Sequence, residues 1–398
     1  MLEVVNLSST CANGAVAHED VGLSISWKRM FRISLAAIAM LAGAQPTVAL
    51  PASGPLETIE RVAPGVWSIR QNQPFELQPV GNVEVIEQGR GLVLIDGGGS
   101  PGSATRITQL IMSVSNKPVT AIAITHWHSD HSLGVTTILR TWPKAEVIAT
   151  NATREHILGA PMAKLYPEGS PDAEKMKPFM DRIAGTLDAL RKRSADATLP
   201  ASIRAGYASA LEEFTLYQKD IDGAFLPAKI DGFEKERVLE DPVRPVQLLF
   251  LGAGNTDGDL VAWLPKQRIV ATGDLVVAPI PYGFDSYGAS WQSVLGKLVA
   301  FRPRIIIPGH GLPMHEDSYL KLLRGMLSDL RTRMTAIGPK EDLEHTAKDL
   351  APAFSGYKKR LVGDDPWRQK WFVTFWQDPI TESLWKESRG MPVEQGGS

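Results

Sequence analysis

The stretch Thr125-His126-Trp127-His128-Ser129-Asp130-His131 decides how the rest of the chain is interpreted. It places three histidines and a carboxylate within the six residues 126–131, directly after the apolar run 121–124. An apolar run of this kind, followed by a polar turn, is typical of a buried strand that ends at the edge of a sheet. Imidazole nitrogens and carboxylate oxygens held there are the ligands that zinc and similar divalent ions prefer.

The spacing within this stretch divides the ligands into two sets. His126 and His128 are two residues apart, so in an extended segment their side chains point the same way. Asp130 and His131 lie on the following turn and face a second point, which suits a pair of metals. The alternative is a polar turn whose histidines only form hydrogen bonds. The chain has just eight histidines in 398 residues, and this clustering favours the metal interpretation.

The same arrangement, a glycine-rich or acidic turn directly after an apolar run, recurs along the chain. It is found at Asp96-Gly97-Gly98-Gly99, Gly252-Ala253-Gly254-Asn255-Thr256, Gly273-Asp274 and Gly309-His310-Gly311. Asp96 follows the apolar run 92–95, and we expect it to orient a metal-bound histidine or the histidine loop through hydrogen bonds. The alternative for Asp96 is a helix N-cap or a turn aspartate.

Strand-like and helix-like patterns alternate through most of the chain, with a helix expected at 131–141 and a strand at about 229–239. This alternation predicts an α/β layered domain over residues 50–340. Residues 151–225 interrupt the alternation with a helical insertion. We expect it to be a lid or one wall of the substrate cleft, while a peripheral bracket or dimer contact is the alternative. Residues 341–398 form a Trp-rich helical extension, and the spacing of Trp367, Trp371 and Phe375 predicts one apolar helix face packed on the body.

Residues 1–49 read as an N-terminal extension and a secretory signal peptide. Lys28, Arg29 and Arg32 precede the apolar run 33–44, which is short for a membrane span, and small residues follow it. This predicts a periplasmic or secreted protein without stable membrane insertion after cleavage, with either Met1 or Met30 as its start. The only cysteine is Cys11, so the mature chain would contain no disulfide and no thiolate ligand.

The composition is that of an ordinary soluble globular protein. Hydrophobic residues make up 43% and charged residues 22%, with a formal net charge of -2. The absence of a basic bias disfavours nucleic acid as a partner and leaves a small-molecule substrate. The sequence does not indicate an oligomeric state.

The loops named above occur in the order found in the metallo-β-lactamase superfamily, and the chain resembles that family over about residues 60–335, apart from the insertion. The resemblance implies a four-layer αββα sandwich with a helical insertion and a helical C-terminal tail. The metals would lie at one edge, between the two sheets.

The resemblance also implies a role for each ligand. His126 and His128 would bind the first metal, Asp274 would bridge the two metals, and Asp130 would also handle the proton of the leaving group. The full second-metal set would be Asp130, His131 and His310. One or two zinc ions are expected, with iron or manganese as alternatives.

Asn255 departs from the family pattern, which has a histidine ligand of the first metal at this position. An amide oxygen is a weaker ligand for zinc than an imidazole nitrogen. We therefore expect Asn255 to be a retained but weakened ligand, while the alternative is that it only hydrogen-bonds its loop. Neither His156 nor His315 is an obvious replacement, and His156 is expected to be structural.

The predicted function is a secreted, zinc-dependent hydrolase in which metal-activated hydroxide attacks a small ester, lactone, thioester or β-lactam. One alternative is a sulfur oxidoreductase with a single iron, which Asn255 makes conceivable. Another is a metal-binding member of the fold with weak catalysis. The fold hosts many chemistries, so the resemblance by itself selects none of these substrates.

Overall fold

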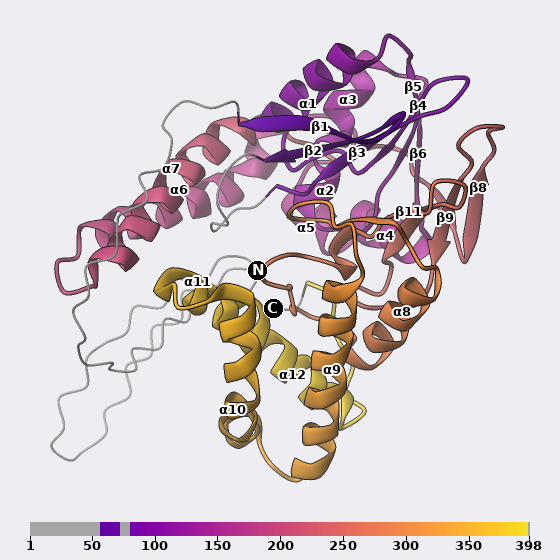
Figure 1. Cartoon of the computed structure of the whole chain (residues 1–398). Coiled ribbons are helices and arrows are strands. Elements are labelled where there is room, and N and C mark those ends of the chain that lie inside the picture. The colour runs from indigo at the N-terminus through magenta and orange to yellow at the C-terminus, as the bar shows by residue number, and fades with distance from the viewer. Residues whose placement is uncertain (1–55, 72–79, 397–398) are drawn as a thin grey trace, which may run out of the picture.

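The computed structural model describes residues 56–71 and 80–396, so the predicted extension and signal peptide (1–49), with Cys11, lie outside the described residues. Two β-sheets face each other (Figure 1). The seven-stranded sheet runs in the order β1 (Glu57–Ala63), β2 (Val66–Gln71), β3 (Val83–Glu87), β4 (Leu92–Ile95), β5 (Val119–Ala123), β6 (Glu146–Thr150), β7 (Asp231–Phe233). The five-stranded sheet runs in the order β12 (Ile305–Ile307), β11 (Ile269–Ala271), β10 (Leu260–Leu264), β9 (Val246–Phe250), β8 (Glu236–Leu239).

The space between the sheets is filled by alternate side chains of their strands. Because successive residues of a strand point to opposite faces, every second apolar residue reaches this inner layer. Both sheets contribute, and all the members are buried: Val66, Ile86, Val93, Ile95, Ala121, Ala123, Ile148 and Phe233 from one sheet, Val246, Leu248, Leu260, Ala262, Leu264, Ile269, Ala271 and Ile307 from the other.

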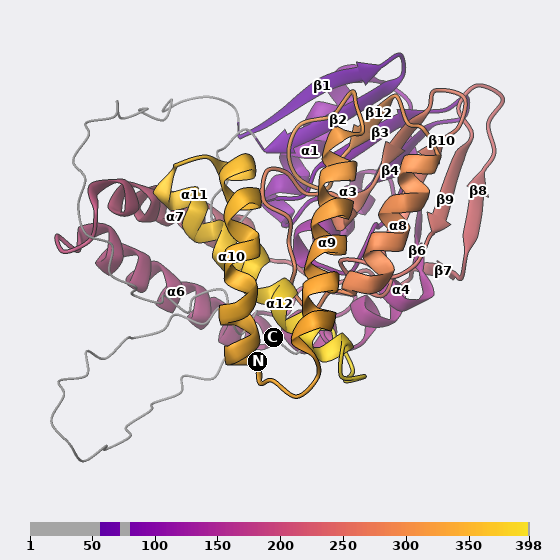
Figure 2. The ribbon, with the colours of Figure 1, turned by 60° about the horizontal axis from the view of Figure 1, so that its bottom comes forward.

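Helices cover the outer face of each sheet. Helices α1 (Pro101–Val114) and α3 (Val135–Thr141) lie against the seven-stranded sheet (Figure 1), and α8 (Gly288–Ala300) and α9 (Ser318–Ile337) lie side by side over the five-stranded sheet (Figure 2). Ser100 begins α1 with a capping box that it forms with Ser103. The predicted four-layer αββα sandwich is confirmed.

The helical insertion consists of α4 (Asn151–Leu158), α5 (Met162–Leu165), α6 (Ala173–Ala195) and α7 (Ala201–Asp220). The long helices α6 and α7 pack together and extend away from the sandwich (Figures 1 and 2). Asp172 caps α6 by accepting hydrogen bonds from the backbone N–H groups of Glu174 and Lys175.

Two predicted elements are divided in the structure. The single strand expected at 229–239 is wrong: β7 joins the seven-stranded sheet and β8 joins the five-stranded one, since the chain crosses between the sheets at this point. The helix expected at 131–141 is interrupted between α2 (Ser129–Ser132) and α3. The chain passes so close to the Asp96 loop at Gly134 that a Cβ there would lie 2.0 Å from the Gly97 carbonyl oxygen.

The C-terminal residues form α10 (Leu343–Val362), α11 (Pro366–Trp371), the π-helical turn η2 (Phe372–Gln377) and α12 (Asp378–Glu387). Trp367, Trp371 and Phe375 are buried in the main core, as their spacing predicted. Within residues 56–71 and 80–396, no helix is both long and apolar enough to span a membrane.

Candidate metal centre

The histidine loop is held at the end of β5 by a carboxylate from the neighbouring strand. Asp96 directly follows β4, and its two carboxylate oxygens accept hydrogen bonds from the Thr125 backbone N–H (2.7 Å) and hydroxyl (2.8 Å). Asp96 adopts a positive φ of 65°, a strained conformation for a residue with a Cβ. The bonds to Thr125 therefore fix the point at which the ligand loop begins.

The first ligand group comprises His126, His128 and Asp274, whose ligand atoms all lie within 4.8 Å of one another. The His126 Nε2 and His128 Nδ1 atoms are 2.9 Å apart, so the two rings converge on one point as their spacing predicted. Asp274 enters from η1 (Gly273–Leu275), after β11 of the opposite sheet, and its Oδ2 lies 3.7 Å from His126 Nε2. All three side chains are buried.

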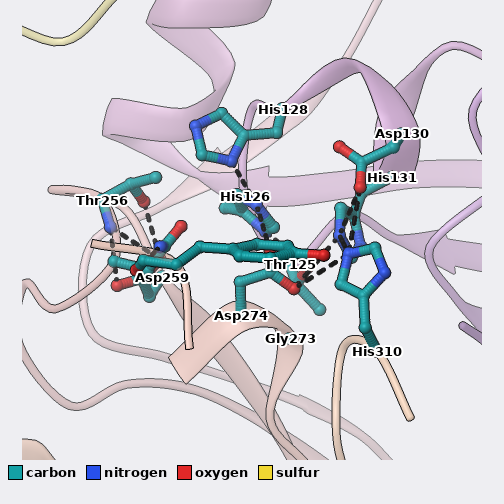
Figure 3. A network of polar contacts seen from close by, with 12 residues as sticks. Thr125, His126, His128, Asp130, His131, Thr256, Asp259, Gly273, Asp274 and His310 are labelled. Atoms are coloured by element: carbon teal, nitrogen blue, oxygen red, sulfur yellow. Dashed lines mark hydrogen bonds and ion pairs between the residues drawn. The ribbon is translucent and has the colours of Figure 1, made fainter. Parts of the chain in front are cut away.

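The second ligand group comprises Asp130, His131 and His310, with ligand atoms again within 4.8 Å of one another. The Asp130 Oδ2 atom lies 3.0 Å from His310 Nε2 and 3.4 Å from His131 Nε2. Asp130 and His131 come from the short helix α2, while His310 follows β12 of the other sheet. The loop ends of both sheets thus meet here (Figure 3).

Asp274 contacts both groups. In addition to His126, its carboxylate lies 3.2 Å from His131 Nε2 and 3.5 Å from His310 Nε2 through Oδ1. Figure 3 shows Asp274 below and between the two sets of imidazoles. This is the position that a bridging carboxylate requires.

The two groups differ in charge. Burial lowers the pKa of His128 to about 4, and burial together with the neighbouring His131 holds the pKa of His126 well below its usual value. These two imidazoles are therefore neutral near pH 7, the form in which histidine binds a metal.

His131 and His310 behave in the opposite way. Burial disfavours their protonated forms, but nearby carboxylates outweigh it: Asp130 and Asp274 raise the pKa of His131 well above its usual value, and Asp274 and Asp130 raise that of His310 to about 9. Protons thus supply the positive charge at the second group, and a divalent cation binding there would displace them.

Asp96 also determines the orientation of His131. The His131 Nδ1 atom lies 2.7 Å from Asp96 Oδ2. A proton shared at Nδ1 leaves Nε2 directed at Asp130, Asp274 and the second ligand group. The structure therefore places Asp96 where the sequence expected an orienting residue.

The donors at both groups fit divalent metal ions. Each group offers two imidazoles and a carboxylate. The Asn255 side-chain N–H₂ donates to the Tyr282 backbone carbonyl (2.9 Å), while its Oδ1 is buried without a hydrogen-bond partner. An orphaned oxygen of this kind is available as a ligand, whereas its amide nitrogen is committed to the loop.

The other two histidines considered from the sequence lie outside both ligand groups of the described residues. His156 forms an ion pair with Asp257, with His156 Nε2 3.0 Å from its carboxylate, and the other ring nitrogen lies 3.2 Å from the Ala160 carbonyl oxygen. Burial lowers the pKa of His156, but the bond to Asp257 outweighs burial and raises it. His156 is accordingly a structural residue beside the metal loop.

Sequence reasoning missed several side chains that hold the centre. Asn82 donates from Nδ2 to the Pro308 carbonyl (2.8 Å) and to the Gly311 carbonyl (3.0 Å), and so clamps the loop that carries His310. Gln395 accepts a hydrogen bond from the Trp127 indole N–H (2.9 Å). No local pattern marks either residue, because each acts on a segment far away in the sequence.

Comparison with known proteins gives the same picture as the geometry. Residues 79–310, more than half of the chain, match the family model of the metallo-beta-lactamase superfamily. The chain belongs to this superfamily. The expected fold and family are thereby confirmed. The proteins similar to this chain include hydrolases.

Individual superfamily members match over different lengths. A linear primary-alkylsulfatase from Pseudomonas sp. (strain ATCC 19151) is 22% identical over 298 residues, 70% of this chain and 51% of that protein. A metallo-beta-lactamase type 2 from Bacteroides fragilis is 30% identical over 92 residues, 22% of this chain and 37% of that protein. An atrochrysone carboxyl ACP thioesterase from Aspergillus chevalieri is 37% identical over 92 residues, 22% of this chain and 29% of that protein.

Among solved structures, a sec-alkylsulfatase from Pseudomonas sp. has a TM-score of 0.54 and 17% identity, and the match covers 85% of this chain and 51% of that one. At this identity the likeness concerns the fold. The chain therefore spans about half the length of both alkylsulfatases that it matches.

Proposed function

We propose that this protein is a metal-dependent hydrolase that cleaves a small ester, lactone, thioester or β-lactam. The observation that carries the proposal is the convergence of two buried ligand groups, each with two imidazoles and one carboxylate, on the shared carboxylate Asp274. Zinc ions bound there would lower the pKa of water toward neutrality and polarise the substrate's carbonyl.

The chain's own residues would perform the positioning and the proton transfer. Asp96 holds His131 in one tautomer, and Asn82 fixes the loop that presents His310. Asp130 would carry a proton to the leaving group. Burial favours its protonated form, yet the charge of His131 and a hydrogen bond from His310 hold the pKa of Asp130 below its usual value.

A substrate panel tests the proposal. The chain from residue 50 onward is loaded with zinc and assayed against a phenyl ester, a lactone, a thioester and the β-lactam nitrocefin, with a chelator-treated sample as control. We expect turnover of at least one substrate that disappears on chelation and returns with zinc. Sulfite formation with iron and oxygen, without hydrolysis, would favour the oxidoreductase alternative. If the fully metal-loaded protein turned over none of these substrates, the alternative of a metal-binding protein with weak catalysis would be favoured.

Sulfate esters are a second candidate substrate class. A relative that matches 70% of this chain is named as a linear primary-alkylsulfatase. Dodecyl sulfate and a secondary alkyl sulfate therefore join the panel, with release of inorganic sulfate as the readout. Carboxylic ester turnover without sulfate release would exclude this class.

We further propose that the protein is exported. The support is the charged and apolar sequence of residues 28–44, followed by small residues. Expression of the full chain in a Gram-negative host, followed by fractionation and N-terminal sequencing, tests it. A periplasmic product beginning near residue 45 or 50 is expected, whereas an uncleaved product in the cytoplasm would contradict export.

A further inference from the structure

The helical insertion contacts the short ligand-bearing helix α2 through a buried tyrosine. Tyr166 follows α5, and its phenol forms side-chain hydrogen bonds with Ser129 and with Tyr217 of α7. Ser129 is the first residue of α2, and the next residue in the chain is the ligand Asp130. The insertion therefore reaches the second ligand group through a contact between two hydroxyl groups.

The hydrogen bonds at Tyr166 converge on its oxygen. Burial raises the pKa of Tyr166 to about 12, while the bonds with Ser129 and Tyr217 lower it, which is the effect of hydroxyl groups that donate to the phenol oxygen. Burial and the neighbouring Tyr166 both raise the pKa of Tyr217, as expected for the donor of the pair. The charge of Asp130 also raises the pKa of both phenols, so its carboxylate lies near them.

Tyr166 is itself held firmly in place. Its backbone N–H donates to the Met162 carbonyl (2.9 Å), and the carbonyl of the next residue, Pro167, accepts a hydrogen bond from the Leu226 N–H (2.8 Å). The Tyr166 ring packs against the ring of Phe179 from α6, with 5.1 Å between the centroids. A side chain whose own position is fixed by packing can fix the group that it contacts.

The backbone of α2 is anchored from the other side by the sandwich. The Gly97 N–H donates to the His131 carbonyl (2.9 Å), and the Gly81 N–H donates to the Asp130 carbonyl (3.3 Å). A helix of four residues is too short to keep its geometry without such contacts. Tyr166 adds an anchor on the insertion side, at the residue next to Asp130.

We propose that Tyr166 is a positioning residue, which acts through Ser129 to hold the Asp130 carboxylate at the second ligand group. The inference rests on the metal centre of the proposed function and gives the insertion a role in it, in place of a peripheral bracket. Asp130 needs such support because its Oδ2 atom has to stay beside His310 Nε2, 3.0 Å away, for both to meet one ion. Groups that orient a ligand from behind raise the affinity of a metal site.

Zinc affinity and the spectrum of bound cobalt test the proposal. Tyr166→Phe removes the hydroxyl and keeps the ring that packs against Phe179. We expect zinc to bind the second ligand group about twofold to tenfold more weakly in this variant, the range that the loss of one hydrogen bond covers. Competition with a chromophoric chelator measures the affinity, and loss of the ion in His310→Gln assigns it to this group. The visible absorption of the cobalt-loaded protein should also shift, because it reports the geometry of the ligands.

The insertion offers a matched control. Tyr207 is a second buried tyrosine of α7, and its ring packs 5.1 Å from that of Trp367. Tyr207→Phe removes a hydroxyl of the same kind and should change neither the zinc affinity nor the cobalt spectrum. Urea unfolding of the metal-free variants detects a folding defect. A Tyr166→Phe protein that is less stable than the native protein, but has its zinc affinity and cobalt spectrum, would overturn the proposal.

A double-mutant cycle identifies the route. Ser129→Ala removes the other partner of the hydrogen bond. If Tyr166 acts through Ser129, the double variant binds zinc no more weakly than the weaker of the single variants, because both changes break the same bond. Losses that add in the double variant would overturn the proposal.

These readouts need no substrate, so they separate this proposal from the hydrolase proposal. The expected changes in zinc affinity and cobalt spectrum, together with an inert substrate panel, would keep the positioning role and reject the hydrolase. Hydrolysis of a panel substrate, with native zinc affinity in Tyr166→Phe, would do the reverse.

Discussion

Side chains of the same type carry different charges within a few ångströms at this centre. His126 and His128 are neutral because burial dominates their pKa, whereas His131 and His310 keep their protons because carboxylates surround them. The metal-free protein therefore already holds cations where the second metal would bind. This charge arrangement has a measurable effect on stability.

The stability of the metal-free protein should fall as the pH rises from 6.5 to 9. The folded-state pKa of His310, about 9, lies above its unfolded value, so its contribution is fully present below about pH 6.5 and is lost as the pH passes through 9. The loss would reach about 3 kcal/mol. Urea unfolding of the chelated protein across this range measures it, and His310→Gln should show a smaller decline. Parallel declines in the two proteins would contradict the assignment.

Asn255→His should strengthen the first metal site. The Asn255 Oδ1 atom is free of hydrogen bonds and is the weaker ligand type, while an imidazole at this position binds zinc better. We expect one tightly held zinc per native chain and two per variant after dialysis against a weak chelator, measured by elemental analysis. Asn255→Ala is the control and should not gain a second zinc. Two tightly held ions in the native chain would show that Asn255 is a competent ligand or a bystander.

At the scale of elements, the C-terminal segment 391–396 contacts the loop that carries the histidines, through Trp127. The Gln395 side chain accepts a hydrogen bond from the Trp127 indole N–H (2.9 Å) and donates one to the Asp285 carbonyl (2.6 Å). The Tyr287 hydroxyl donates to the Val393 carbonyl (3.3 Å). The Trp127 ring in turn packs 4.4 Å from the ring of His128, so the end of the chain supports a ligand of the first group.

Gln395→Ala should speed the loss of metal from the first group. The variant leaves the nearly buried Trp127 N–H without an acceptor, and an unsatisfied N–H of this kind costs about 1–3 kcal/mol. We expect an increase of up to about tenfold in the zinc dissociation rate, followed with a chromophoric chelator. Glu394→Ala changes an exposed neighbour in the same segment and serves as the control. Equal zinc dissociation rates in Gln395→Ala and Glu394→Ala would show that the C-terminal segment does not support the metal site.

At the scale of the whole molecule, the centre joins the two sheets. His126, His128, Asp130 and His131 follow a strand of the seven-stranded sheet, whereas Asp274 and His310 follow strands of the five-stranded sheet. Metal ions bound by both sets would tie the halves of the sandwich together at one edge. Elsewhere the sheets are held by the apolar layer between them and by contacts such as the Arg237–Glu146 ion pair.

Zinc should therefore stabilise the native fold as a whole. Free zinc at about 100 times its dissociation constant adds about 2.7 kcal/mol, which corresponds to a rise in Tm of about 3–4 °C for a chain of this size. Thermal unfolding with zinc and with chelator measures the difference. Asp274→Asn weakens both ligand groups at once and should lose most of the increase. The same Tm with and without zinc in the native protein would argue that the metals do not link the sheets.

The sequence by itself determined the ligands and the layers. His126 and His128 converge because two residues of an extended segment share a face, and each remaining candidate ligand follows an apolar strand, at a loop that the family resemblance pointed to. The break at Gly134 and the division of 229–239 were missed, because both depend on which segment lies alongside.

Only the tertiary structure decided which residues support the centre. Gln395 meets Trp127 across 268 positions, and Asn82 meets Pro308 across 226. Likewise, the opposite charges of His128 and His310 follow from burial and from neighbouring carboxylates, not from residue type. The physical reason is that periodicity and turn chemistry act over a few residues, while burial, charge and contact between distant segments arise only when the chain is packed.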